Sequence, residues 1–269
     1  METTEKALAH KRNKRLLIWI TSLLLFIVMA IFIFYLTLAV YASSRWVRET
    51  NNEFAAKEGA AADPELHTDE AFIALQKEIA FKKARLKMAA TDSIGLSINL
   101  PDSLLLLEVS GVTVASVKIN KQKLSRSFRG IEHTALAGLL SNALLTTNST
   151  STIVKEPIIE KMAPRDTLEA NLPEKTVDTT KNEPVFFELA LEKGIRLFVL
   201  QEETTALDRT NRFNFMLKRS MAKAARNLKS IFRFELPDYH PEILLIIPAS
   251  DARAIYRALP EKGRVAIHM

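Results

Sequence analysis

The chain has 269 residues and a formal net charge of +6 at pH 7, with 37 lysines and arginines against 31 aspartates and glutamates. It contains no cysteine, which excludes disulfide bonds, thiolate metal sites and a cysteine nucleophile. The five histidines and seven glycines are scattered, so there is neither a spaced histidine pair for a metal nor a glycine-rich phosphate loop. We therefore expect no metal, no cofactor and no nucleic-acid partner.

An apolar run without a charged residue extends from Leu16 to Val40. Roughly 20 helical residues cross a bilayer core of ~30 Å, so the run predicts a single transmembrane helix at residues 16–40. The alternative is a cleaved signal peptide, because Val40-Tyr41-Ala42 resembles a weak cleavage site. The apolar region of such a peptide is only about 7–15 residues long, which favours an uncleaved anchor.

Basic residues gather before this run, at Lys6, Lys11, Arg12, Lys14 and Arg15. The positive-inside rule then makes residues 1–15 a cytoplasmic tail and places everything after the span outside. The sequence thus predicts a single-pass protein of the inner (cytoplasmic) membrane whose main domain is periplasmic.

Residues 41–90 are predicted to form a short polar stalk followed by a membrane-proximal helix, which Thr68 or Asp69 can cap. Heptad-like spacing is shown by Phe72, Leu75, Ile79 and Leu86, with Lys82 or Lys83 interrupting the seam. Two interpretations follow. The helix either packs on its own domain or makes a coiled-coil contact through residues 69–90 in a homo- or hetero-oligomer.

Residues 91–269 are predicted to form a β-rich α+β domain with peripheral helices. Ile94, Leu96 and Ile98 alternate with polar residues, which predicts a strand. Apolar segments on both sides of Ser110-Gly111 predict a hairpin, and segments rich in β-branched and aromatic residues on both sides of Glu192-Lys193-Gly194 predict a second one. IEHTALAGLLSNALL is expected to be a helix of about four turns. The chain is expected to close with the strand EILLIIP, a helix capped by Ser250 and the strand RVAIHM. Residues of about 146–184, rich in threonine, lysine and proline, are expected to form a polar insertion.

A basic helix is predicted around residues 209–232. One face of the helix can be shared by its apolar residues Phe213, Leu217, Met221, Ala224, Leu228 and Phe232. The cations lack intervening acids, so two interpretations remain open. One is an ordinary surface helix whose cations meet acids elsewhere. The other is a binding face for an anionic partner, formed by Arg209, Arg212, Lys218, Arg219, Lys223, Arg226 and Lys229.

Three segments together resemble the L,D-transpeptidase catalytic domain. IPASDARAIYRALPEKGRVAIHM is similar to the helix and last strand of that family, SLLLLEVSGVTVASVKI to its opening strands, and PVFFELALEKGIRLFVL to the strand pair that carries an upstream histidine. The resemblance implies a mixed sheet or sandwich, and a site where a cysteine attacks a peptide-stem carbonyl with the help of histidine and arginine.

The catalytic groups of that family are missing. The register of the resemblance places Leu244 where the family has its cysteine, Glu242 at the motif histidine and Ile246 at the arginine, with the upstream histidine near Phe198. Leucine cannot be deprotonated, so no thiolate chemistry can occur there. Ser250, His240 and Asp251 are close in sequence but lack a nucleophile elbow. The resemblance therefore implies a former active site in a protein that is not an enzyme.

Two functions follow from these observations. The first is a membrane-anchored cell-envelope protein with an inactive L,D-transpeptidase-like domain that binds or scaffolds a cell-wall enzyme or peptidoglycan. The second is a structural or assembly component of an envelope complex with an unrelated α+β fold.

Overall fold

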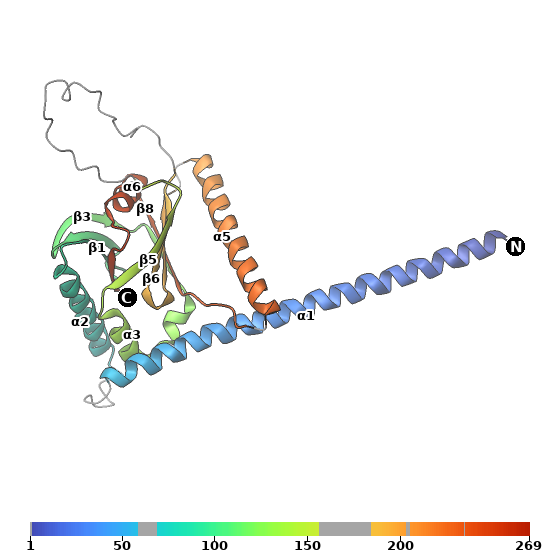
Figure 1. Cartoon of the computed structure of the whole chain (residues 1–269), viewed down its shortest axis with the longest axis horizontal. Coiled ribbons are helices and arrows are strands. Elements are labelled where there is room, and N and C mark those ends of the chain that lie inside the picture. The colour runs from blue at the N-terminus through green and yellow to red at the C-terminus, as the bar shows by residue number, and fades with distance from the viewer. Residues whose placement is uncertain (1, 59–68, 156–183, 203–204, 234) are drawn as a thin grey trace, which may run out of the picture. The chain divides into compact units, whose positions relative to one another are not determined.

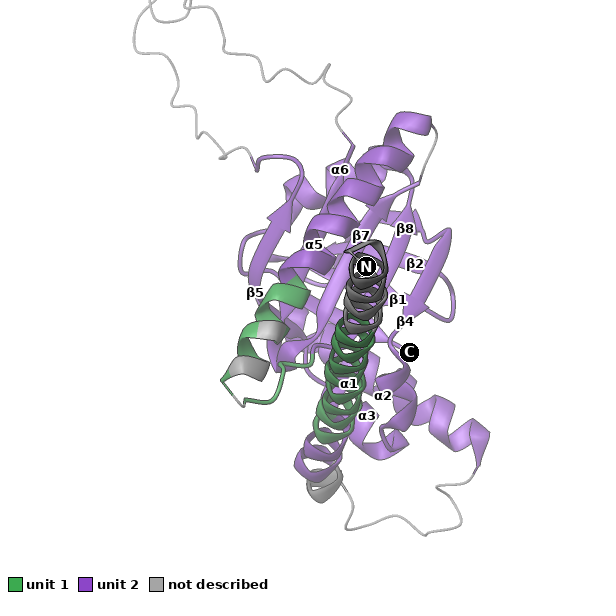
Figure 2. Cartoon of the chain, turned by 90° about the vertical axis from the view of Figure 1, so that its right-hand side faces the viewer, with its two compact units in different colours: residues 1–46, 223–239 green, residues 47–222, 240–269 purple. Residues whose placement is uncertain are grey.

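The computed structural model describes residues 2–58, 69–155, 184–202, 205–233 and 235–269 of the chain. It divides into two compact units, one of residues 1–46 and 223–239 and one of residues 47–222 and 240–269 (Figure 2). The first unit is helical, and the second holds the nine strands of a mixed sheet. An α+β fold that begins with a long apolar helix is therefore confirmed.

The first unit is built on helix α1, Glu2–Glu58, which is 57 residues long. By length and composition α1 is able to cross a membrane. The last turns of α5 (Ala206–Phe232) belong to the same unit, where the Asn227 side-chain amide donates a hydrogen bond to the Tyr35 hydroxyl at 3.0 Å. The ring of Trp46 lies 6.3 Å from that of Tyr239.

Helix α1 does not end where we expected a polar stalk. Residues 46–58 contain no glycine or proline, so nothing in the sequence interrupts the helix before Gly59. Within the second unit, this end of α1 packs on the domain: Phe54 is buried, and the Asn51 side chain accepts a hydrogen bond from the Glu132 amide. The rest of the expected stalk, residues 59–65, lies outside the described residues.

The sheet of the second unit has the order β3-β2-β1-β9-β5-β6-β7-β8-β4. Pairs β1–β9 and β7–β8 are parallel, and the other pairs are antiparallel. Only Ile119 and Asn120 separate the edge strands β3 and β4, so the sheet curls until its two edges approach. The strands are β1 (Ile94–Asn99), β2 (Leu104–Val109), β3 (Val112–Lys118), β4 (Lys121–Leu124), β5 (Leu144–Ser151), β6 (Phe186–Leu191), β7 (Arg196–Gln201), β8 (Glu242–Ile247) and β9 (Arg264–His268).

Short helices cover this sheet. α2 (Glu70–Ala89) and α3 (His133–Leu140) pack together beside β9, and α6 (Ala249–Ala258) lies against β7 (Figure 1). The core beneath α2 joins Phe81, Ala84 and Met88 to residues of the sheet. Arg85 of α2 forms an ion pair with Glu108 of β2, whose side chain is almost fully buried. Two 3-10 helices, η2 (Arg126–Gly130) and η3 (Glu192–Gly194), complete the connections.

Most predicted elements are present. Both hairpins form, and Ser110 and Gly111 have the positive φ values, 49° and 84°, that a tight turn requires. Asp69 caps α2 by accepting a hydrogen bond from the amide of Ala71. The helix is packed on its own domain, as one of our two interpretations held, but through residues other than the heptad positions. Leu75, Ile79 and Leu86 of that seam are exposed.

Three further local predictions are wrong, and one strand was not predicted. The expected four-turn helix ends at Leu140, because Leu144 and Leu145 pair with β9. Residues 146–151 of the expected insertion continue this strand as β5, whose threonines suit a sheet. Ser250 does not cap α6: Pro248 holds the cap position, and the Ser250 hydroxyl bonds Asp251. Strand β4 was not anticipated. Residues 156–183 of the insertion lie outside the described residues.

Candidate functional site

The parallel pair β7–β8 brings together the residues that the family resemblance placed at a former active site. In its register Phe198 is opposite Leu244 and Leu200 is opposite Ile246. Side chains alternate along a strand, so these four residues share one face of the sheet. Val199 and Leu245 point to the opposite face, where both are fully buried.

Helix α5 covers this face. Phe186, Leu200 and Ile246 form a buried cluster, against which Phe215 and Met216 of α5 pack together with Leu244. The rings of Phe186 and Phe215 are 5.7 Å apart and tilted by 35°. The place to which the resemblance assigns a former active site is therefore filled by apolar side chains from a sheet and a helix.

Arg219 of α5 covers the same group of residues, because its guanidinium contacts Phe198 and Glu242. The guanidinium carbon lies 3.4 Å from the centre of the Phe198 ring, and one guanidinium nitrogen is 2.7 Å from a carboxylate oxygen of Glu242. Both interactions stabilise this half-buried cation, the first as a cation–π contact and the second as a charge-assisted hydrogen bond. Glu242 is thus held by an ion pair, and its amide donates a hydrogen bond to the Ser125 hydroxyl.

The side chains at this place offer little chemistry. Phe198, Leu244 and Ile246 have no group that can attack a carbonyl or transfer a proton. His240 and Ser250 stand at opposite ends of β8, roughly 20 Å apart for a six-residue strand, and each has its own hydrogen-bond partner. Among the described residues, no group of three or more His, Asp or Glu side chains is arranged to hold a metal ion.

The basic helix is only partly the free cationic face that the sequence suggested. Arg219 faces the sheet, and Arg209, Arg212 and Lys223 also interact with other groups of the chain. Of these four residues, Arg219 is paired with a carboxylate, as the interpretation of an ordinary surface helix held. Lys218, Arg226 and Lys229 are exposed.

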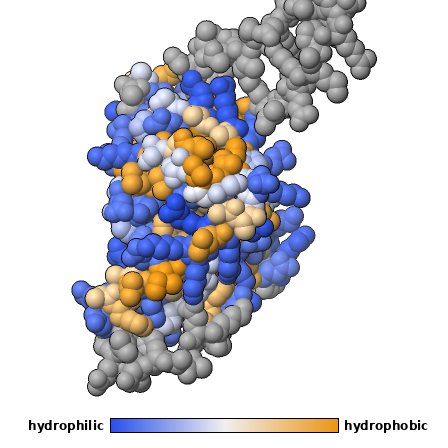
Figure 3. Space-filling model, turned by 90° about the vertical axis from the view of Figure 1, so that its left-hand side faces the viewer, coloured by the Kyte–Doolittle hydropathy of each residue, from blue (hydrophilic) through white to orange (hydrophobic). Residues whose placement is uncertain are grey.

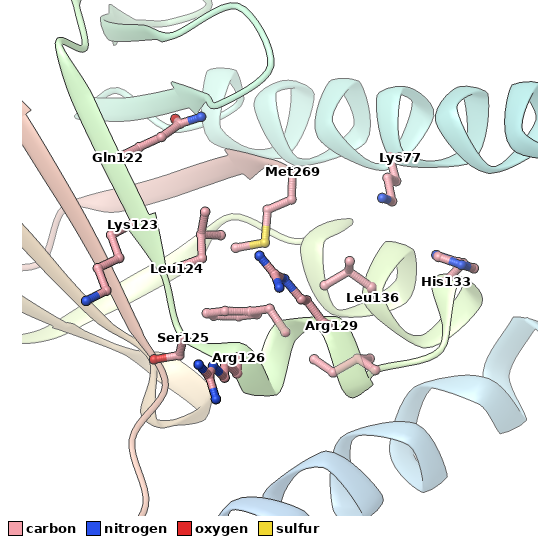
Figure 4. A pocket seen from close by; sticks show the side chains of 12 residues that line it. Lys77, Gln122, Lys123, Leu124, Ser125, Arg126, Arg129, His133, Leu136 and Met269 are labelled. Carbon is pink, nitrogen blue, oxygen red and sulfur yellow. The ribbon is translucent and has the colours of Figure 1, made fainter.

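An open pocket of about 770 Å³ lies elsewhere in the second unit, between α2, β4, η2, α3 and the carboxyl end. Figure 4 shows Lys77 extending down from α2 and Arg129 up toward Met269, whereas Lys123 and Arg126 turn away. The described residues that line it include no aspartate or glutamate. A pocket with this lining suits an anionic group.

Two features of these sites escaped prediction from sequence. The basic side chains that line the pocket come from separate elements of the chain, so no local sequence motif predicts the pocket. The position of Arg219 depends on how α5 lies on the sheet, and the helical spacing of the apolar residues did not predict this. The one indication in the sequence was that Phe215 and Met216, the apolar residues of α5 that pack on the sheet, lie outside the apolar face predicted for this helix.

Comparison of the chain with protein-family models, with curated proteins and with solved structures finds no match.

Proposed function

We propose that this chain is a single-pass protein of the inner membrane whose periplasmic domain is an inactive relative of L,D-transpeptidases and acts by binding. Its ligand is peptidoglycan or an enzyme that builds it. The observation that supports this proposal is the packed place around Phe198, Leu244 and Arg219, where the family would carry its catalytic groups. The positive charge before the apolar run supports the orientation.

The basic pocket supports the binding role. Wall peptides carry carboxylates, and lysine and arginine side chains bind carboxylates by charge-assisted hydrogen bonds. Lys77 and Arg129 point into a pocket that is open to solvent, in contrast with the closed place under α5.

Sedimentation with isolated peptidoglycan tests this function. The full chain in detergent should pellet with the polymer, and the double variant Lys77→Gln/Arg129→Gln should pellet much less. Lys83→Gln/Lys262→Gln, which removes two exposed cations outside the pocket, is the matched control and should bind as the parent does. Equal binding by all three proteins would contradict a role for the pocket. Incorporation of a labelled D-amino acid into the polymer by the parent chain would contradict the inactive domain.

A second candidate, an assembly component, is favoured by apolar groups exposed on one face of the second unit. Leu75, Ile79 and Leu86 of α2 and Val112 and Val114 of edge strand β3 are exposed. Figure 3 shows the side of the domain on which α2 and β3 lie in Figure 1, where apolar patches lie among polar groups. If these residues make protein contacts, the molar mass of the full chain in detergent should fall when Leu75→Ser and Leu86→Ser are introduced together. A monomeric parent chain would remove self-association from this candidate.

A further inference from the structure

The basic pocket of the second unit, between α2, β4, η2 and α3, is lined by two cations that no carboxylate of the described residues neutralises. The side chains of Lys77 and Arg129 point into it (Figure 4), and among the described residues neither has an ion pair or a hydrogen bond. Three partly buried arginines elsewhere in this unit are each paired with a carboxylate: Arg85 with Glu108, Arg196 with Glu188 and Arg219 with Glu242. A ligand that complements the pocket therefore carries an anionic group.

Apolar side chains line the same pocket. They come from three elements, with Leu124 on β4, Phe128 on η2 and Leu136 on α3. Phe128 and Leu136 are otherwise buried in the domain, so the surface that they present is held in place by the core. An apolar group of the ligand that covers this surface removes apolar area from water, which favours binding. A simple anion such as phosphate leaves it uncovered.

Gln122 adds a hydrogen-bond acceptor. Side chains alternate along a strand, so Gln122 and Leu124 share the face of β4 that lines the pocket, whereas Lys123 turns away (Figure 4). The Gln122 side-chain nitrogen donates a hydrogen bond to the Leu100 carbonyl oxygen at 3.1 Å, which fixes the amide group. The amide oxygen remains able to accept a hydrogen bond from an N–H group of a ligand.

The last residue of a peptide carries all three complementary groups, namely a carboxylate, a side chain and an N–H. We propose that the basic pocket binds the carboxyl-terminal residue of a peptide that ends in an apolar side chain. The carboxylate lies between Lys77 and Arg129. The side chain contacts Leu124 and Phe128, and the N–H donates to Gln122. This inference rests on the proposed function, because it narrows the ligand of this pocket from the wall polymer to the free ends of its peptides.

Binding of short peptides to the full chain in detergent tests the proposal. The probe is Gly-Gly-Gly-Leu with a free carboxylate and an uncharged nitrobenzoxadiazole fluorophore on its amino end, made with L- and with D-leucine, and binding is followed by fluorescence anisotropy. Three further peptides each change one group. One ends in a carboxamide, one has glycine in place of leucine, and one has a methyl group on the nitrogen of the last peptide bond.

For the enantiomer that binds more tightly, the carboxamide should bind about tenfold more weakly, because a charge-assisted hydrogen bond is lost. The glycine peptide should bind roughly fivefold more weakly and the methylated peptide roughly threefold more weakly. In Lys77→Gln/Arg129→Gln the carboxylate and the carboxamide should bind alike. Leu124→Thr should abolish only the preference for leucine over glycine. The control Lys83→Gln/Lys262→Gln, which removes two cations outside the pocket, should bind all peptides as the parent does.

Three results would overturn the proposal. Equal binding of the carboxylate and the carboxamide by the parent would show that the cations do not hold the end of the peptide. Octanoate that displaces the probe as well as the unlabelled peptide does would show a site for any apolar anion. Equal weakening by the control variant and by Lys77→Gln/Arg129→Gln would show attraction by the overall charge of the domain.

Sedimentation with peptidoglycan separates this inference from the proposed function. Peptide binding that requires Lys77 and Arg129, in a chain whose pelleting with the polymer does not, would reject the role of the pocket in wall binding and leave the peptide site. Pelleting that requires both cations, without binding of any of the peptides, would reject the peptide site and leave the proposed function.

Discussion

Arg219 is the residue on which the packing of α5 over Phe198 and Glu242 depends most. Its guanidinium stacks on Phe198 and pairs with Glu242, so Arg219→Ala removes both interactions and leaves a half-buried carboxylate without its cation. We expect a loss of roughly 2 kcal/mol in the free energy of unfolding, measured by urea denaturation. Arg219→Lys should recover only part of it, because lysine lacks the planar group that stacks.

The neighbouring residue supplies the control for this experiment. Lys218 is exposed, so Lys218→Ala should change stability by less than about 0.5 kcal/mol. Similar losses from both substitutions would mean that the contact with Phe198 contributes nothing specific.

His268 gives the folded domain a dependence on pH. Its ring stacks on Phe81 and bonds the Asn99 side chain, and burial lowers its pKa below the ordinary 6.5, against smaller opposing effects of Glu78 and Asp102. The unfolded chain therefore binds a proton more readily than the folded domain does. Stability should fall as the pH drops below about 6.5 and should be unaffected by this residue at higher pH.

Substitution isolates that contribution. His268→Gln should flatten the change of unfolding free energy between pH 7 and pH 5 relative to the parent. An unchanged pH profile in His268→Gln would show that other groups cause the dependence.

At the scale of elements, the end of α1, residues 47–58, packs on α3 within the second unit at a glycine. A side chain added at Gly138 of α3 would meet Phe54 at 3.2 Å, closer than ordinary contact. Gly138→Leu should therefore displace residues 47–58 and speed hydrogen exchange of their amides. Gly130→Ala, which would meet Val47 at an ordinary 3.5 Å, is the matched control. Unaltered exchange in Gly138→Leu would show that this packing does not hold the helix.

The elements that could be predicted from sequence are those with local signals. The turn glycines fixed both hairpins, and Asp69 marked the start of α2. The continuous apolar run in EILLII correctly indicated a buried strand. The wrong predictions concern residues whose partners are remote: Leu144 is apolar and helix-compatible, and only its pairing with Val265 of β9 makes it a strand residue. Strand β4, KQKL, lacks an apolar pattern because it is an edge strand that pairs only with β8.

The candidate site also has features that could be predicted from the sequence and features that could not. The proximity of Phe198 and Leu244 was expected from the family resemblance, and the register of β7 and β8 agrees with that placement. The contact of Arg219 with both β7 and β8 needed the position of α5 on the sheet, which no spacing in the sequence specifies. The spacing of Phe213, Leu217 and Met221 gave their common face correctly but did not reveal that this face is exposed.

For the whole molecule, the proposed orientation gives a simple expectation. Alkaline phosphatase requires disulfide bonds and so becomes active only in an oxidising compartment. Fused after Met269 it should be active in bacterial cells, and fused after residue 15, before the apolar run, it should be inactive. The reverse pattern would place the main domain in the cytoplasm.

Leu244, where the proposed resemblance places the catalytic cysteine of the family, lies in a packed contact under α5. Leu244→Cys puts a thiol there in a chain that has no other cysteine, and its reaction with a maleimide reports whether the place is open. Val114→Cys, at a position 57% exposed on β3, is the reference, and labelling in urea shows that both thiols are reactive. We expect labelling at position 244 of the folded chain to be at least about tenfold slower than at position 114, which corresponds to a local opening that costs ~1.4 kcal/mol. Equal rates at the two positions would show an open cleft and contradict this account.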